Sequence, residues 1–324
     1  MKPIEQIKWQ CRKSWSVLEK CSRQAYSYCA QWIINHWPFV KERFLCYLVL
    51  IRFDKPIGTL LLLWPALWAL WIAAEGTPSL HLFLVFTLGV FLTRSAGVIF
   101  NDFADKKFDP HVERTRERPL ATGKVSSREA FLVAGLLLLV AFLLVLTTNT
   151  FTVYLSFCAI PLILIYPYMK RHTYIPQFFL GIAFSWSIPM VFAAQSNSLP
   201  RIAWLLFIAN TLWVVIFDTI YAMVDREDDL KIGIKSTAIL FAESDRFMIG
   251  ILQGMLLTVF VIIGIQLKLG FIYYGALGVV TAIMIYHQIL IKDRLPKQCF
   301  RAFLNNHWLG AAVFAGICLD YLYN

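Results

Sequence analysis

The chain has 324 residues, of which 59% are hydrophobic and only 15% are charged. Soluble domains average about 25% charged residues, whereas the apolar residues here form runs of about twenty, long enough for a helix to cross a bilayer. The composition excludes a soluble globular protein and predicts an all-α polytopic membrane protein. The net charge of +10 would suggest nucleic acid as a partner of a soluble protein. Here the basic residues fall in short loops between apolar spans, so we expect the lipid bilayer and no nucleic acid as a partner.

Residues 1–46 form a basic N-terminal extension with eight Lys or Arg and four Trp. Such a segment suits a helix lying on the membrane surface, and it equally suits a poorly ordered extension. It contains no continuous apolar stretch before residue 44, so we expect no cleaved signal peptide.

Nine apolar segments follow within residues 47–324, which we expect to form one domain of nine transmembrane helices. They cover about 56–74, 82–104, 130–147, 151–169, 175–194, 201–221, 247–266, 270–291 and 303–322. Pro161, Pro176 and Pro189 are expected to kink their spans locally.

The loops between these segments alternate in charge. One set holds almost all of the Lys and Arg, and it comprises the N-terminus, 105–129, 170–174, 222–246 and 292–302. The other set holds a single lysine, Lys268, with Arg201 at the edge of a span. The positive-inside rule places the first set in the cytoplasm, which predicts a cytoplasmic N-terminus and a periplasmic C-terminus.

An acidic cluster ends the second span. Asn101, Asp102, Asp105 and Asp109 lie within nine residues and would share one helix face with Arg94. Carboxylates at this spacing repel one another, so their repetition predicts a bound cation. Oxygen ligands alone suit Mg²⁺ or Ca²⁺ better than zinc. The basic residues that could hold a phosphate bridged by such an ion are Arg114, Arg116, Arg118 and Lys124.

A second acidic cluster follows the sixth span. Asp218, Tyr221, Asp225, Asp228 and Asp229 would also share one helix face. One such cluster alone is equally compatible with a solvated loop. Two clusters on the same side, each continuing a transmembrane helix, favour a single site with enough ligands for two Mg²⁺ ions that are bridged by a substrate diphosphate.

The surrounding apolar walls indicate a lipid-like substrate. An allylic diphosphate on a long hydrocarbon chain would satisfy both the polar and the apolar part of the site. Mg²⁺ and basic side chains stabilise the charge of a departing diphosphate, and aromatic faces stabilise an allylic cation. A site within a helix bundle would also keep water away from that cation.

The sequence resembles the UbiA superfamily of intramembrane prenyltransferases. NDFADKKFD is similar to its NDxxDxxxD motif, and DREDD is similar to its second, DxxxD-type motif. RFDKPIGTLLLLWPALWAL, VERTRERPLATG, YPYMKR and DTIYAMVDREDDLKIGIKSTA extend the likeness over residues 47–322. These phrases resemble the branch that prenylates 4-hydroxybenzoate in bacterial ubiquinone biosynthesis.

This resemblance implies nine helices around a central cavity that opens laterally to lipid, in the bacterial cytoplasmic (inner) membrane. It implies Mg²⁺-dependent transfer of a polyprenyl group from polyprenyl diphosphate to the ring carbon ortho to the hydroxyl of 4-hydroxybenzoate. The implied catalytic and metal-binding residues are Asn101, Asp102, Asp105, Asp109, Asp225 and Asp229. The implied substrate-binding residues are Arg94, Arg52, Arg114, Arg118, Lys170, Asp218 and Tyr221.

Arg94 is the residue we expect to bind the carboxylate of the acceptor, because it lies deeper along its helix than the acids do. The alternative is a permanent ion pair with an acid such as Asp225. Three other functions are alternatives: a prenyltransferase with another aromatic acceptor, a cation-coupled transporter and a CDP-alcohol phosphotransferase. The phosphotransferase motif is absent, and a transporter would place its acids near the middle of the membrane.

Overall fold

The computed structural model describes residues 41–323, and the chain divides into two units, Met1–Val49 and Leu50–Asn324. In the first unit the described residues, 41–49, are helical. The basic extension expected over residues 1–46 therefore falls largely outside the described residues. No strand occurs between residues 41 and 323.

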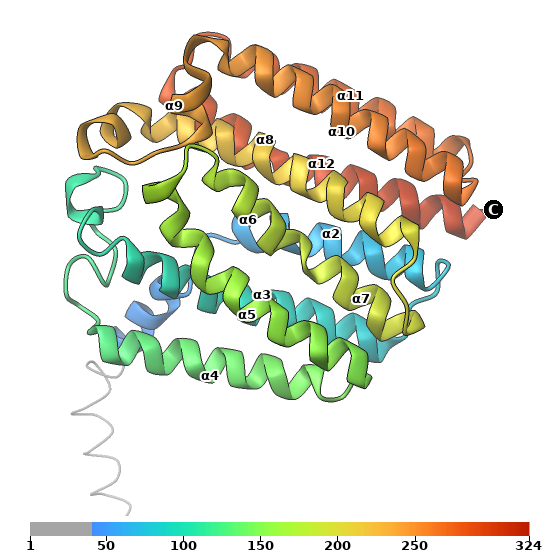
Figure 1. Ribbon diagram of the computed structural model, residues 1–324, viewed down its shortest axis with the longest axis horizontal. Coiled ribbons are helices and arrows are strands. Elements are labelled where there is room, and N and C mark those ends of the chain that lie inside the picture. Colours follow the sequence, from blue (N-terminus) through green and yellow to red (C-terminus); the bar gives the residue numbers. More distant parts are fainter. Residues whose placement is uncertain (1–40, 324) are drawn as a thin grey trace, which may run out of the picture. The chain divides into compact units, whose positions relative to one another are not determined.

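The second unit is built from helices, most of them joined by short loops, with a longer connection between Ala104 and Ser127 (Figure 1). Its α-helices are α2 (Ile57–Ala73), α3 (Leu80–Ala104), α4 (Ser127–Val145), α5 (Thr150–His172), α6 (Pro176–Ser185), α7 (Ser187–Ser196), α8 (Arg201–Ile232), α9 (Thr237–Phe241), α10 (Asp245–Leu267), α11 (Phe271–Leu290) and α12 (Pro296–Tyr323). Two short 3-10 helices are η1 (Asp109–His111) and η2 (Ala242–Ser244).

Eight stretches of the described chain are long and apolar enough to cross a membrane, and α2 is a shorter apolar helix of 17 residues. Each of the nine segments expected from the sequence coincides with one of these stretches. Large apolar side chains point outward along α4, where Leu132, Leu136, Leu139 and Leu143 are at least half exposed. Such a surface suits lipid and not water. The chain is a multi-pass, all-α membrane protein, as the composition predicted.

Polar side chains fix the starts of several helices. Ser79 begins α3 by accepting a hydrogen bond from the backbone N–H of Leu82. Ser126 and Glu129 form a capping box at the start of α4, and Asn149 caps α5. These caps satisfy backbone N–H groups that have no partner within the helix.

Of the two prolines in α6 and α7, Pro176 differs from the sequence prediction of a local kink, and Pro189 agrees with it. Pro176 stands in the first turn of α6, where a helix tolerates it, so it begins this helix and does not kink it. The span around Pro189 is divided at Trp186 into α6 and α7. Pro189 lacks an N–H and cannot bond the carbonyl of Ser185, which explains the break at this point.

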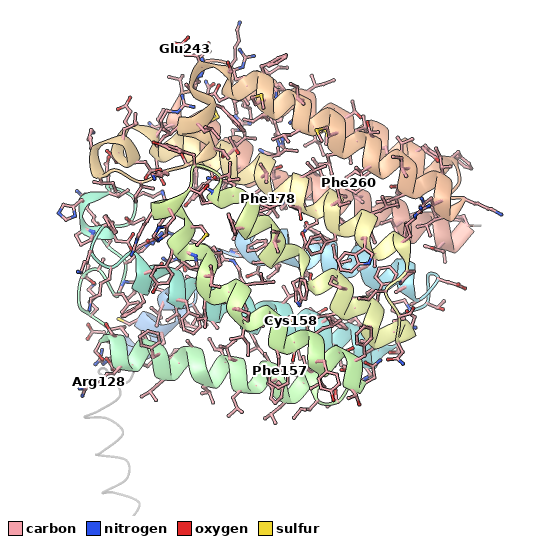
Figure 2. All side chains as sticks on the ribbon, in the orientation of Figure 1. Arg128, Phe157, Cys158, Phe178, Glu243 and Phe260 are labelled. Carbon is pink, nitrogen blue, oxygen red and sulfur yellow. The ribbon has the colours of Figure 1, made fainter. Side chains whose placement is uncertain are left out.

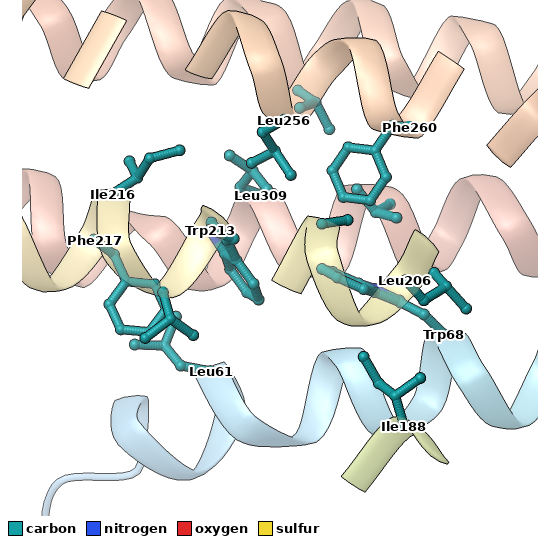
Figure 3. Packing of buried hydrophobic residues seen from close by; sticks show 14 of the residues in the cluster. Leu61, Trp68, Ile188, Leu206, Trp213, Ile216, Phe217, Leu256, Phe260 and Leu309 are labelled. Carbon is teal, nitrogen blue, oxygen red and sulfur yellow. The ribbon is translucent and has the colours of Figure 1, made fainter. Parts of the chain in front are cut away.

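The core of the second unit lies where α2 and α8 meet α12 and α10 (Figure 3). The indole rings of Trp68 and Trp213 lie 5.2 Å apart, and Phe260 packs edge-on against Trp68 at 5.6 Å. Trp68 donates its Nε1–H to the carbonyl of Gly310 at 3.0 Å. Trp213 donates to Asn306 at 3.2 Å. The aromatic core therefore fixes α12 against α2 and α8.

Gly310→Ala should destabilise this core. A Cβ atom at residue 310 would lie 2.5 Å from Trp64 and 2.6 Å from Trp213, so both rings would have to move. Overpacking of this kind costs about 1–3 kcal/mol. Thermal unfolding in detergent measures the loss. Gly135→Ala on exposed α4 is the matched control, because nothing lies within 4 Å of a Cβ there. Equal stability of both variants would contradict the packing described.

The orientation in the membrane remains a prediction from the loop charges. Cysteines introduced singly at Lys124 and Ser198, in a variant without the seven native cysteines, should react with an impermeant reagent from opposite sides of the membrane. Lys124 lies in a basic loop and Ser198 in a loop without basic residues, so the positive-inside rule places them on opposite sides. Labelling of both positions from one side would show that the orientation is wrong.

Candidate functional site

The first acidic cluster lies where α3 ends. Asn101 and Asp102 belong to the last turn of α3, Asp105 is its C-cap, and Asp109 begins η1. The expectation that all of these residues share one helix face is therefore wrong beyond Asp102. Pro110 stands in the first turn of η1, directly after Asp109.

The second acidic cluster lies on the last turns of α8. This helix runs without interruption to Ile232 and ends at Gly233, which has a left-handed φ of 73°. Asp218, Asp225 and Asp229 are thus carried by one continuous helix, as the sequence predicted. Asp228 forms an ion pair with Lys231 at 3.2 Å on the more exposed side of α8, so it does not join the other acids.

Arg114 connects the two clusters. It lies in the loop that follows the first cluster, and its Nε and Nη2 donate to the two carboxylate oxygens of Asp225 at 3.1 and 2.5 Å. Its guanidinium also lies 4.7 Å from the centre of the Tyr221 ring. Residues that are 111 positions apart in the sequence are therefore in direct contact at one end of the bundle.

Lys170, at the end of α5, lies between the same two clusters. It forms an ion pair with Asp105 and interacts electrostatically with Asp218 and Asp229. The backbone N–H of Lys235 donates to its carbonyl at 2.9 Å, which anchors this end of α5 to the loop after α8. α3, α5 and α8 thus all contribute to one charged region.

Two arginines neutralise the remaining acids of the first cluster. Arg52 donates to both carboxylate oxygens of Asp102, at 3.0 and 2.8 Å. Arg118 lies 3.0 Å from Asp102 and donates to both oxygens of Asp109 at 3.0 Å. The backbone of Arg52 has a φ of 58°, a conformation that costs energy for a residue other than glycine.

Burial makes the carboxylates of the first cluster unusual. Asp102, Asp105 and Asp109 are each at most 4% exposed. Loss of water raises the pKa of Asp109 to about 6, although the nearby Arg118 guanidinium opposes this change. Asp109 is therefore mostly ionised at neutral pH and depends on its basic partner.

The donor atoms of the site suit a hard divalent cation. They are carboxylate and amide oxygens, and Oδ1 of Asp105 is buried without a hydrogen-bond partner. Among the described residues, however, no group of three or more His, Cys, Asp or Glu side chains is arranged to hold a metal ion. In this structure ion pairs with basic side chains are formed instead by the carboxylates of Asp102, Asp105, Asp109 and Asp225. The residues fit Mg²⁺ chemically, provided that these ion pairs open.

Arg94 lies on α3, seven residues before Asn101, and its guanidinium packs against Gly58 of α2. A Cβ atom on Gly58 would lie 2.5 Å from Nη2 of Arg94. Nε of Arg94 is buried without a partner, and between residues 41 and 323 no ion pair is recorded for this side chain. The alternative pairing with Asp225 is not observed, because Asp225 is bound to Arg114.

Two residues near Arg94 were not identified as site residues from the sequence. Tyr166 of α5 interacts electrostatically with Arg94 and Asp218. Gly58 gave no signal beyond its position after a proline, because close contact with a distant residue leaves no periodic pattern. Arg116, which the sequence grouped with the basic cluster, is exposed.

Comparison with known proteins defines the class of protein to which this arrangement belongs. Residues 62–310 match the UbiA prenyltransferase family. The chain belongs to this family, which confirms the expectation of a prenyltransferase and argues against a transporter. The match spans α3, α5 and α8, so both acidic clusters lie within it.

Curated relatives are more than half identical to this chain over most of its length. A 4-hydroxybenzoate octaprenyltransferase of Aeromonas hydrophila is 55% identical over 282 residues, which cover 87% of this chain and 98% of the relative. A 4-hydroxybenzoate octaprenyltransferase of Methylococcus capsulatus is 56% identical over 284 residues, which cover 88% of this chain and 97% of the relative.

Solved structures share the fold at lower identity. The apo structure of a UbiA homolog from Aeropyrum pernix K1 has a TM-score of 0.72 and 24% identity, covering 81% of this chain and 97% of that chain. A UbiA homolog from Archaeoglobus fulgidus, bound to GPP and Mg²⁺, has a TM-score of 0.62 and 18% identity, covering 84% of this chain and 99% of that chain. These two likenesses concern the fold alone.

Asp105→Ala and Asp225→Ala should each remove most prenyl transfer, although 120 positions separate these residues. Loss of one anionic ligand forfeits about 3 kcal/mol of transition-state stabilisation, or roughly 100-fold in rate. Turnover at limiting Mg²⁺ measures the effect. Asp228→Ala is the matched control, because Asp228 pairs with Lys231 away from the site. Near-normal turnover in either site variant would refute the assignment.

Proposed function

We propose that this protein transfers a polyprenyl group from polyprenyl diphosphate to the ring carbon ortho to the hydroxyl of 4-hydroxybenzoate, with Mg²⁺, in ubiquinone biosynthesis. The observation that carries the proposal is the meeting of two acidic clusters and several basic side chains at one end of an apolar helix bundle. The names of the curated relatives support the acceptor. The GPP and Mg²⁺ bound by the Archaeoglobus homolog support the donor and the metal.

The proposed metal and diphosphate site uses residues from both clusters. The oxygen ligands for two Mg²⁺ ions are Asn101, Asp102, Asp105, Asp109, Asp225 and Asp229. When bound, Mg²⁺ supplies Lewis-acid stabilisation of the departing diphosphate. Arg114, Arg118 and Lys170 would then release their carboxylates and donate to phosphate oxygens. If the metal and the diphosphate bind together, the carboxylates gain a cation and the basic side chains gain an anion, so that each keeps a partner of opposite charge.

The reaction breaks the C–O bond between the allylic carbon and the diphosphate, and the electron pair leaves with the diphosphate. The ring carbon of the acceptor then forms the new C–C bond and loses its proton. Tyr221 belongs to a row of neighbouring aromatic rings. The centre of its ring lies 4.5 Å from the centre of the Phe303 ring, which lies 6.2 Å from that of Phe217. These faces favour an allylic cation and exclude the water that would quench it.

The acceptor carboxylate needs a cation that the diphosphate does not use. Arg94 suits this role because it lies about 10 Å along α3 from Asn101 and has no recorded ion pair among residues 41–323. Its planar guanidinium binds a carboxylate through two parallel hydrogen bonds, whereas a lysine ammonium cannot. Gly58 permits the observed position of this guanidinium, since it has no Cβ.

Arg94→Lys should weaken the use of 4-hydroxybenzoate by about 10- to 1000-fold, if the lost contact resembles truncation of a buried charge pair at about 2–4 kcal/mol. The apparent KM for polyprenyl diphosphate should change much less. Steady-state kinetics with each substrate varied in turn measure both values. An acceptor without a carboxylate should show little difference between the variant and the native enzyme.

Gly58→Ala provides an independent test of the same division of the site. The added methyl group would displace the Arg94 guanidinium without changing its charge, so the KM for the acceptor should rise in this variant too. Gly97→Ala is the matched control, because the nearest atom to a Cβ there lies 3.9 Å away. If the KM for polyprenyl diphosphate rises and the KM for 4-hydroxybenzoate is unchanged, Arg94 belongs to the diphosphate side.

The proposed function as a whole is tested with the purified protein, polyprenyl diphosphate, 4-hydroxybenzoate and Mg²⁺. We expect 3-polyprenyl-4-hydroxybenzoate as the product, and loss of turnover on chelation of the metal, because the carboxylates then lack the ion that stabilises the leaving group. Mass spectrometry of the extracted lipid identifies the product. Turnover only with a different aromatic acceptor would retain the prenyltransferase and overturn the substrate.

The placement of the protein follows from the same proposal. We infer that residues 47–324 form the prenyltransferase domain in the bacterial cytoplasmic membrane. Nine transmembrane helices surround a central cavity, with the acidic clusters on the cytoplasmic side. Residues 1–46 are then a cytoplasmic extension. The basic loop over 105–129 supports this orientation.

A further inference from the structure

A groove separate from the acidic clusters lies between the start of α10 and the end of α11. Its volume is about 570 Å³, and it is lined by Glu243, Arg246, Phe247, Gly250, Ile251, Gln288 and Arg294. None of these residues belongs to the proposed reaction site. In Figure 2, Glu243 at the mouth of the groove lies at the same end of the helices as Arg128 at the start of α4. This is the end at which the acidic clusters meet.

Two guanidinium groups line the groove, and they differ in their hydrogen bonds. Arg294 is held in place, because it donates to Asp245 at 3.1 Å and to the carbonyl of Glu243 at 2.5 Å. Its backbone φ of 53° is left-handed. Arg246 differs, since its Nε–H is buried without a hydrogen-bond partner. A donor left unsatisfied in this way lacks an acceptor that a bound anion can provide.

The net charge of the residues that line the groove limits the charge of an anion that binds there. Arg246 and Arg294 contribute two positive charges and Glu243 one negative charge, so the lining carries a net charge of +1. Asp245, beneath the groove, is balanced by its ion pair with Arg226. The Glu243 carboxylate repels a dianion such as a phosphate monoester more strongly than a monoanion. A phospholipid head group with a net charge of −1, whose only charged group is its phosphodiester, matches this lining.

An apolar strip continues from the cationic part of the groove. Phe247 is 70% exposed and Ile251 is 41% exposed, and the two stand one turn apart on α10. Gly250 also lines the groove and has no side chain, and a Cβ there would lie 3.7 Å from the side chain of Gln288. A water-soluble anion gains nothing from such a strip, whereas the acyl chain of a lipid would cover it.

We propose that this groove binds a membrane phospholipid with an anionic head group. The phosphodiester accepts hydrogen bonds from Arg246 and Arg294, and the first part of an acyl chain lies on Phe247 and Ile251. Basic pockets between transmembrane helices on the cytoplasmic side recognise anionic lipids in this manner. The bound lipid joins the start of α10 to the loop between α11 and α12.

The experiment measures lipid retention by the full-length protein in nanodiscs of phosphatidylcholine containing one-fifth phosphatidylglycerol. Native mass spectrometry should show preferential phosphatidylglycerol adducts on the native protein. Arg246→Gln should reduce that preference by about tenfold, because a charge-assisted hydrogen bond is lost. Arg128→Gln is the matched control, with the same change of charge on an exposed residue outside the groove, and it should keep the preference. Prenyl transfer should be unchanged in both variants.

Phe247→Ala separates a lipid from a free phosphate compound. It should weaken phosphatidylglycerol retention, and soluble glycerol phosphate should not displace the lipid. Three results would overturn the proposal: equal retention of phosphatidylcholine, equal loss in both arginine variants, or displacement by glycerol phosphate with no effect of Phe247→Ala. Because the groove shares no residue with the reaction site, a failure here leaves the proposed prenyl transfer untouched.

Discussion

The structure depends on the neutralisation of carboxylates that are buried at one end of a membrane protein. Asp102, Asp105 and Asp109 are almost fully buried. An ionised carboxylate in such surroundings costs several kcal/mol unless a cation lies beside it. The cations come from three separate places, Arg52 before α2, Lys170 at the end of α5 and Arg118 in the loop after η1. The acids therefore determine where these segments lie.

These ion pairs also explain how the site can hold its substrates. A buried pair gives little net stability, because desolvation nearly cancels the attraction, so exchanging its partners costs less than breaking it. Under the proposed function, Mg²⁺ would supply the cations for the carboxylates, and the diphosphate would supply the anion for the basic side chains. Each charge would then change its partner, and none would be left buried alone. A metal without diphosphate, or diphosphate without metal, would leave part of the site uncompensated.

Much of this arrangement was predictable from the sequence, and the limits have physical causes. Hydrophobic runs predicted the helices, because a bilayer imposes length and composition directly. Asp218, Asp225 and Asp229 were correctly grouped, since one regular helix places them at constant angles, whereas Asp228 pairs with Lys231 instead. The acids after α3 were not, because Asp105 and Asp109 lie beyond the end of that helix.

Contacts between distant segments are what periodicity cannot reveal. The pairing of Arg114 with Asp225 joins residues 111 positions apart, and the sequence suggested only that both lie on one side. The ion pairs of Arg226 and Arg294 with Asp245 gave no signal, although they fix the loop between α8 and α10. Gly58 was equally hidden, since its importance lies in a Cβ that it lacks. Such features depend on packing, which follows only from three-dimensional structure.

Arg94 is the exception to the charge pairing of the site. Arg52, Arg114, Arg118 and Lys170 each have an acidic partner, whereas within residues 41–323 none is recorded for Arg94. A buried cation without a partner is unfavourable, so its retention in the structure requires a reason beyond stability. The contact with Gly58 holds the guanidinium in place without neutralising it. Under the proposed function, the second anionic substrate would supply the missing charge, and its carboxylate would be bound apart from the diphosphate. The ring between the two anions would then meet the allylic carbon at the boundary between the charged site and the row of aromatic rings.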